Sequence, residues 1–139
     1  MWTKSHSLVT KDATKEQMWK LFADVNNWYS WDTGIEYAKM EGPFEKGNNF
    51  TLKPKGGPKV KIQLLETIEN RKFVDCTTFP LAKMTGTHTF EDTSNGLKIT
   101  TTMTVTGPLA FLWTKIVAQK IVDGLPTEMI EQVKYASKL

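Results

Sequence analysis

Cysteine, arginine and long apolar runs are all scarce in this sequence of 139 residues. The one cysteine, Cys76, cannot form a disulfide within the chain, so we expect a reducing compartment. Arg71 is the sole arginine among 18 basic residues, which argues against nucleic-acid binding, because proteins that read phosphates and guanine edges concentrate arginine. The most apolar stretch, residues 108–122, contains Lys115 and Lys120 and is too short to span a bilayer.

The N-terminal residues also lack the uninterrupted apolar core of a signal peptide, and we therefore expect a cytoplasmic protein without stable membrane insertion. Apolar residues make up 40% of the chain and aromatic residues 11%, which excludes a disordered or collagen-like chain. No internal repeat or low-complexity tract divides the sequence. We expect one globular domain over residues 1–139.

The motifs of common cofactor and metal sites are absent as well. His6, Cys76 and His88 are far apart in the sequence, and no Cys-x-x-Cys or His-x-x-x-His pair is present, so we expect no metal. No glycine-rich phosphate loop occurs, and we expect no cofactor. Cys76 has no evident base beside it, which favours a buried, unreactive thiol over a nucleophile.

Periodicity predicts a strand, two short helical segments, a series of strands and a long final helix. Thr14 to Gln17 fits a capping box, which marks the start of the first helix. The clearest strand covers residues 97–106, where apolar side chains and threonines alternate, as in an antiparallel strand with one buried face. The other predicted strands cover residues 2–10, 35–40, 49–53, 60–68 with a bulge, 72–78 and 84–90.

The final helix is predicted to begin at Pro108, because proline is favourable at a first helical position. Residues 109–122 are apolar on more than one side, which predicts that the sheet encloses this part, Trp113 and Val117 included. Pro126 removes a backbone hydrogen bond and is predicted to kink or break the helix near residues 122–126.

Short motifs along the chain have the order and spacing of a known fold. They are Ala13–Phe22, Trp28–Trp31 followed by Ile35, Gly42 with Gly47, Gly86–Glu91, Gly96–Thr100 and Gly107–Leu109. Together they resemble the START and birch-pollen-allergen-like superfamily, and within it the bacterial polyketide cyclase/dehydrase and lipid-transport-like proteins. The resemblance extends over nearly the whole chain. Pro126 departs from the continuous helix of that family.

This resemblance implies an α+β helix-grip fold. In such a fold, a curved antiparallel sheet of six or seven strands wraps around a long C-terminal helix, and two short helices follow the first strand. A sheet curved around one helix leaves space that small side chains do not fill. We therefore expect a cavity for a small hydrophobic molecule, such as a lipid, isoprenoid, polyketide or aromatic metabolite.

The candidate ligand-binding residues are mostly aromatic or apolar. Trp28 and Trp31 are expected to gate the cavity, although core packing is equally consistent with the sequence. The remaining candidates are Tyr37, Phe50, Leu52, His88, Phe90, Thr101, Met103, Trp113 and Val117.

His88 is the best polar candidate, because its strand places it on the same face as Met84 and Phe90. There it would orient a ligand's polar group, or act as an acid or base near neutral pH; the alternative is a histidine bonded to a neighbouring side chain. Asp75 is the second candidate, and we expect it to be exposed to solvent rather than paired with His88 or Arg71.

Three classes of function remain open at this point. The first is a binding protein for a hydrophobic ligand, and the second is a polyketide cyclase or dehydratase that uses His88 in the same cavity. The second would require another polar group that converges on His88. The third is a module that docks on another protein; such a partner is possible but nothing in the sequence indicates one, and a large exposed apolar patch would favour it.

Overall fold

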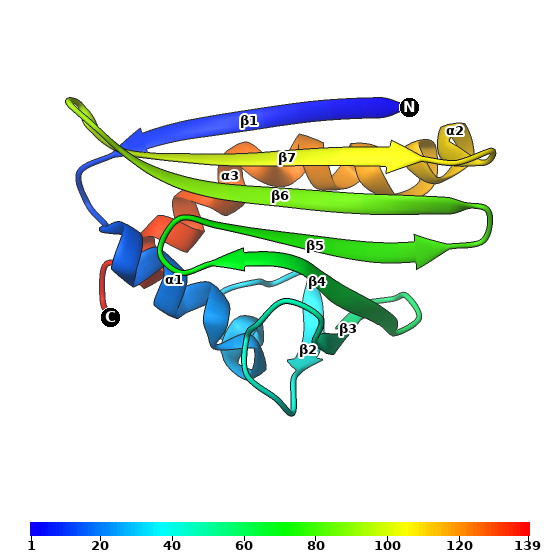
Figure 1. Ribbon diagram of the computed structural model, residues 1–139, viewed down its shortest axis with the longest axis horizontal. Coiled ribbons are helices and arrows are strands. Elements are labelled where there is room, and N and C mark those ends of the chain that lie inside the picture. Colours follow the sequence, from blue (N-terminus) through cyan, green and yellow to red (C-terminus); the bar gives the residue numbers. More distant parts are fainter.

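The computed structural model describes residues 1–139 and contains one curved sheet of seven antiparallel strands. The strands are β1 (Trp2–Thr10), β2 (Ile35–Lys39), β3 (Asn49–Pro54), β4 (Val60–Ile68), β5 (Lys72–Phe79), β6 (Ala82–Thr93) and β7 (Gly96–Thr106). Their order in the sheet is β1-β7-β6-β5-β4-β3-β2, so the first strand pairs with the last (Figure 1). The predicted strands are therefore confirmed, and their number is seven.

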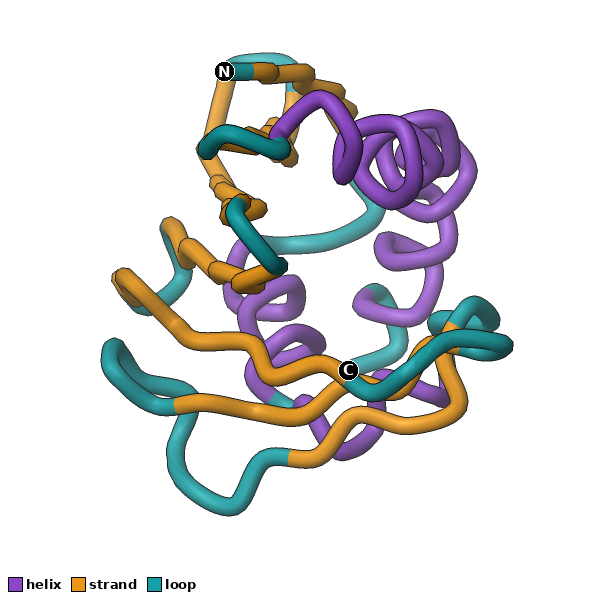
Figure 2. Tube along the Cα trace, turned by 90° about the vertical axis from the view of Figure 1, so that its right-hand side faces the viewer, coloured by secondary structure: helices purple, strands orange, loops and turns teal.

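The helical segments lie on the concave side of this sheet (Figure 2). They are α1 (Lys15–Ala23), the 3-10 helix η1 (Val25–Ser30), α2 (Ala110–Trp113), the π-helical segment η2 (Thr114–Ala118) and α3 (Gln119–Ala136). Helix α1 begins with the predicted capping box. The Gln17 backbone N–H donates to Thr14 Oγ1 at 3.1 Å, and the Thr14 backbone N–H donates to Gln17 Oε1 at 2.9 Å.

Strand β7 shows why the sheet has one apolar face. Leu97, Ile99, Thr101, Met103 and Val105 are buried on the concave side, as the alternation predicts. On the convex side, hydroxyl groups of β7 meet those of β1: Thr104 and Thr3 are 2.9 Å apart, Thr102 and Ser5 2.7 Å, and Thr100 and Ser7 2.9 Å. Where β1 and β7 pair, hydroxyl groups on the convex face thus bond to one another without a covering layer.

The bulge predicted in residues 60–68 is also present. The register of β4 against β5 shifts between Leu64 and Glu66. Leu64 is fully buried, whereas Leu65 and Ile68 are exposed on the opposite face. The extra residue therefore changes which side chains of the strand reach the core.

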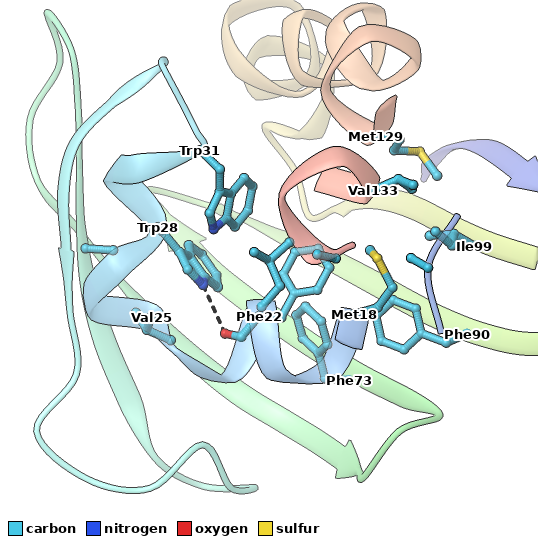
Figure 3. Packing of buried hydrophobic residues seen from close by; sticks show 14 of the residues in the cluster. Met18, Phe22, Val25, Trp28, Trp31, Phe73, Phe90, Ile99, Met129 and Val133 are labelled. Atoms are coloured by element: carbon cyan, nitrogen blue, oxygen red, sulfur yellow. Dashed lines mark hydrogen bonds between the residues drawn. The ribbon is translucent and has the colours of Figure 1, made fainter. Parts of the chain in front are cut away.

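The apolar core consists of two separate clusters. The larger one has 21 buried residues and joins α1, η1 and the C-terminal half of α3 to the sheet (Figure 3). Its centre is aromatic: the Phe22 ring lies 5.1 Å from that of Phe73 and 5.9 Å from that of Phe90. The smaller cluster has six buried residues, namely Ala82, Met84, Met103, Val105, Ala110 and Ala118.

The start of the final helical region differs from the prediction. Trp113 and Val117 are partly buried against the smaller cluster, but Phe111, Leu112 and Ile116 are exposed. The expectation that residues 109–122 are enclosed on several sides is therefore wrong. The sheet contacts these residues on one side, and nothing in the chain covers the other.

Pro126 does not break the final helix. Residues 119–136 form one helix with Pro126 inside it, because Leu125 and Met129 on either side are buried in the larger cluster and hold this part against the sheet. The irregular part of the helix is η2, which precedes the proline. None of the helices combines the length and the hydrophobicity that a membrane span requires.

Candidate functional site

A band of polar side chains crosses the concave face between the two apolar clusters. Along β7, Ile99 belongs to the larger cluster and Met103 to the smaller one, while Thr101 lies between them. Along β6, His88 takes the same position, directly opposite Thr101 in the strand register. Asp75 continues the band on β5, where its register partner is Gly86. We call Asp75, His88 and Thr101 the polar band.

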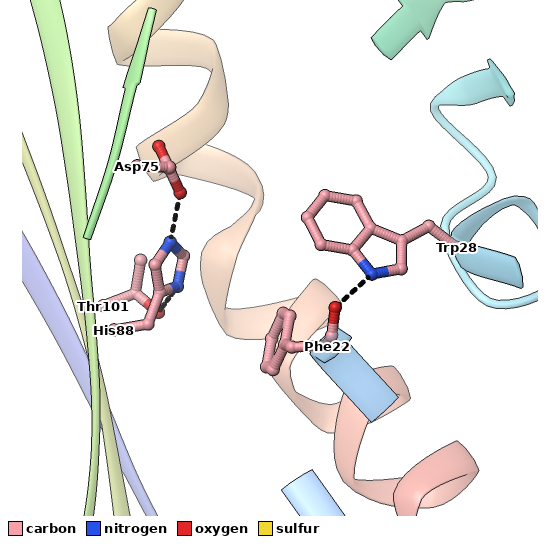
Figure 4. A network of polar contacts seen from close by, with 5 residues as sticks. All are labelled: Phe22, Trp28, Asp75, His88 and Thr101. Carbon is pink, nitrogen blue, oxygen red and sulfur yellow. Dashed lines mark hydrogen bonds and ion pairs between the residues drawn. The ribbon is translucent and has the colours of Figure 1, made fainter. Parts of the chain in front are cut away.

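Hydrogen bonds connect the members of this band (Figure 4). His88 Nε2 lies 2.9 Å from Asp75 Oδ2, and Thr101 Oγ1 lies 3.4 Å from His88 Nδ1. The imidazole also stacks on Phe73, with ring centroids 4.2 Å apart and planes 9° apart. These contacts hold the ring in one orientation, because both ring nitrogens have hydrogen-bond partners and one face lies on Phe73.

Gly86 leaves the room that this pair requires. A Cβ atom at this position would lie 2.8 Å from Asp75 Oδ1 and 3.1 Å from His88 Nε2. Any larger residue would therefore push the carboxylate away from the imidazole.

The expectation that Asp75 faces solvent is wrong. Phe73, Asp75 and Thr77 form the inward face of β5, and the Asp75 side chain is only 17% exposed. The sequence of this strand is ambiguous because Val74 and Cys76 on the other face are also buried. Apolar alternation could therefore not decide which side is inward.

Two carboxyl groups from other elements have raised pKa values, and one of them, Glu128, interacts with the charge of His88. Glu128 lies on α3, and Asp32 follows η1. Burial and the charge of Asp32 raise the pKa of Glu128 to about 7, while the charge of His88 and the side chain of Gln132 act in the opposite direction. Burial also raises the pKa of Asp32, against a hydrogen bond from the Gly34 backbone N–H and the charge of Lys55.

Gln132 is the third polar side chain missed by the sequence analysis. It is buried, and its Oε1 atom has no hydrogen-bond partner. One signal was available: Glu128 and Gln132 are four residues apart and each directly precedes a residue of the apolar stripe, Met129 and Val133. No local pattern marks Asp32 as a neighbour of Glu128, because the fold alone brings η1 near α3.

The inward polar groups keep some surface that water can reach. The side chains of His88 and Asp75 remain 15% and 17% exposed although they face the concave side. Space the size of a water molecule therefore adjoins them. Two open surface hollows, of about 630 and 400 Å³, lie elsewhere: neither is lined by His88, Asp75 or Glu128.

The predicted ligand-binding residues divide into three groups. His88 and Thr101 lie in the polar band. A second group belongs to the larger cluster: Trp28, Trp31, Phe50 and Phe90 are buried in it, and Leu52 is partly buried against it. The smaller cluster contains Met103, and Trp113 and Val117 are partly buried against it. Tyr37 is exposed on β2.

Trp28 and Trp31 have the packing of core residues. The Trp28 indole N–H donates to the Phe22 carbonyl oxygen at 2.9 Å, and the Trp28 ring meets those of Trp31 and Phe50 at 5.9 and 5.1 Å. Each residue is buried. A gating role for the two tryptophans stays a prediction.

The site has acid–base chemistry but no cluster suited to a metal. No group of three His, Cys, Asp or Glu side chains is placed to hold a metal ion. The imidazole of His88 is oriented by its hydrogen bond to Asp75. The Glu128 carboxyl, with a pKa of about 7, can exchange a proton near neutral pH. Both groups can also hydrogen-bond a polar group placed between the sheet and α3.

A seven-stranded sheet that grips a long C-terminal helix, with a polar band inside, defines a helix-grip domain. Residues 3–134 match the family described as polyketide cyclase / dehydrase and lipid transport, and the chain belongs to this family. The family and fold expected from the sequence motifs are thus confirmed.

Solved structures with the same fold share little sequence with this chain. The hypothetical protein jhp0584 from Helicobacter pylori is 14% identical, with a TM-score of 0.77 over 97% of this chain and 88% of that one. Ara h 8.0201 is also 14% identical, with a TM-score of 0.76 and 99% of both chains covered. No curated protein matches the sequence.

The third structure is the di-domain ARO/CYC StfQ from the steffimycin biosynthetic pathway. It is 15% identical, with a TM-score of 0.72 over 98% of this chain and 50% of that chain. This chain therefore spans about half of StfQ.

Proposed function

We propose that this protein binds a small, largely apolar molecule between the curved sheet and the C-terminal helix, with the ligand's polar group against His88. The observation that carries the proposal is the position of the polar band between two apolar clusters. Polar groups inside an apolar core cost stability unless they are hydrogen-bonded, and the polar band meets this condition through its own contacts. Its side chains nevertheless keep some exposed surface, which a polar group of a bound molecule would contact. The family's description, which includes lipid transport, supports the same proposal.

The direct test is to identify what the purified protein carries and binds. Native mass spectrometry would detect a co-purified molecule, and a thermal-shift screen of lipophilic metabolites would find binders. We expect His88→Ala to weaken binding about two- to tenfold, the range for one hydrogen bond to a neutral group. The control is Thr87→Ala, which changes the neighbouring residue on the opposite face of β6.

An outcome in which no lipophilic molecule binds the wild-type protein would contradict the proposal. Unchanged affinity of the His88→Ala variant would show that the ligand lies elsewhere. A cytoplasmic location also stays a proposal, to be tested by cell fractionation.

A second candidate function is acid–base conversion of the bound molecule, such as cyclisation or dehydration. The observation that favours it is the hydrogen bond between Asp75 and His88, which supplies the additional polar group that such an enzyme requires. The charge of His88 also lowers the pKa of Glu128, against the larger effects of burial and Asp32. Here His88 would move a proton, and its loss would slow the reaction about 10²- to 10⁴-fold. The chemical fate of the ligand with wild type and His88→Ala distinguishes the two functions.

A further inference from the structure

Four large apolar side chains are exposed on the segments that lie at one end of the molecule, near α2. Leu81, in the turn from β5 to β6, is 65% exposed; Phe111 and Leu112 of α2 are 73% and 37% exposed; Ile116 of η2 is 47% exposed. Figure 1 shows α2 and the turn between β5 and β6 at one end of the sheet. We call these four residues the end patch.

Contacts beneath the end patch hold the turn that carries Leu81 against the segment that begins the final helical region. The Leu109 backbone N–H donates to the Leu81 carbonyl oxygen at 3.0 Å. The Trp113 indole N–H donates to the Pro80 carbonyl oxygen at 2.9 Å, and its ring stacks on Phe79 at 4.5 Å. The patch is therefore a built surface that faces outward, and its side chains are not core residues left uncovered by a loose segment.

The charged residues nearest to the end patch in the sequence are lysines. Lys83 follows Leu81 by two residues, Lys115 precedes Ile116, and Lys120 lies one turn further; all three are exposed. The chain has 15 acidic residues, but none occurs in residues 76–90 or 93–122. The two stretches that carry the end patch thus contain lysines and no carboxylate, and the first acidic residue after the second stretch is Asp123.

We propose that the end patch docks this protein onto the surface of an anionic lipid bilayer. Phe111, Leu112 and Ile116 would enter the boundary between headgroups and acyl chains, and the lysines would lie among anionic headgroups. A second copy of the chain is a poorer occupant, because a face-to-face dimer would bring the same lysines together. This docking does not depend on the interior ligand.

The experiment measures co-sedimentation with vesicles of phosphatidylcholine, with and without phosphatidylglycerol. We expect binding only to the anionic vesicles, with loss at high salt. The double variant Phe111→Ser/Ile116→Ser should reduce partitioning at least about tenfold, since two exposed apolar side chains no longer enter the bilayer. The matched control is Ile130→Ser, on α3 outside the patch, where the side chain is 58% exposed.

The charge contribution is tested separately. Lys83→Gln and Lys115→Gln should each weaken partitioning about fivefold, whereas Lys134→Gln, near the other end of α3, should have little effect. Circular dichroism verifies that each variant is folded.

Three results would overturn the proposal. They are no sedimentation of wild type with anionic vesicles, equal partitioning of the double variant and wild type, and self-association of wild type that the double variant abolishes. None of them affects the interior binding proposal, which the ligand screen tests independently.

Discussion

Glu128 is a side chain whose pKa depends strongly on the surrounding fold. Burial and the charge of Asp32 raise its pKa from 4.5 to about 7. Between these two pH values the folded protein holds a proton that the unfolded chain has already released. The stability from this group is therefore fully present below about pH 4.5 and is lost as the pH rises through about 7.

We predict that Glu128→Gln removes most of this pH dependence. The wild-type free energy of unfolding should fall by up to about 3 kcal/mol between pH 4.5 and pH 8, and the variant should fall less, because glutamine stays neutral. Urea denaturation at several pH values measures both. The control is Glu131→Gln, which removes a carboxyl from the same helix.

Parallel pH profiles for wild type and Glu128→Gln would show that Glu128 titrates normally in the folded protein. Asp32 remains in the variant and its raised pKa acts in the same direction, so a small slope should persist.

Sequence reasoning located His88 and Thr101 because strand alternation states which side chains share a face. It missed Asp32, Glu128 and Gln132. These residues come together because η1 and α3 lie near each other in the fold, and the periodicity within one element does not predict such a contact. It also placed Asp75 wrongly, because both faces of β5 are buried. Residues on strands with one apolar face were thus predictable, and residues brought together by tertiary packing were not.

Strand β7 is the element whose two faces differ most clearly in packing. Its inner side chains extend from one apolar cluster to the other, and its outer hydroxyls bond to β1. Substitutions on the two faces should therefore differ in their effect on stability.

We predict that Met103→Ala destabilises the fold by about 2–5 kcal/mol, because Met103 is buried in the smaller cluster. Thr102→Ala should cost about 1 kcal/mol or less, since it removes one exposed hydrogen bond to Ser5. Chemical denaturation measures both variants. A loss below about 1 kcal/mol for Met103→Ala would instead indicate that its side chain borders open space.

The final helical region shows the limit of reasoning from single elements. Apolar residues on several sides predicted an enclosed helix, whereas the structure leaves Phe111 and Ile116 exposed. Apolar periodicity predicts which side chains are buried, but it does not predict whether this chain or another surface buries them.

At the scale of the whole molecule, β1 pairs with β7, so the first strand in the sequence lies beside the last. The overall fold was predictable because the order of elements and short motifs together resemble a known superfamily. This pairing, however, must wait until distant parts of the chain meet, which slows folding.

We predict that refolding from denaturant takes milliseconds to seconds, in the range of domains dominated by non-local strand pairing. Stopped-flow fluorescence of the five tryptophans measures the rate. Refolding complete within microseconds would contradict the inference that the β1–β7 pairing limits the folding rate.

The sheet is not closed, so β1 and β2 each keep a free edge. Unpaired backbone groups on such edges can recruit strands from other molecules and begin aggregation. In this chain the short β2 has an irregular register between Ile35 and Tyr37, and β1 carries the exposed Lys4 and lies against α3. The charge of Lys4 on β1 and the irregular register of β2 thus oppose intermolecular strand pairing at the two edges.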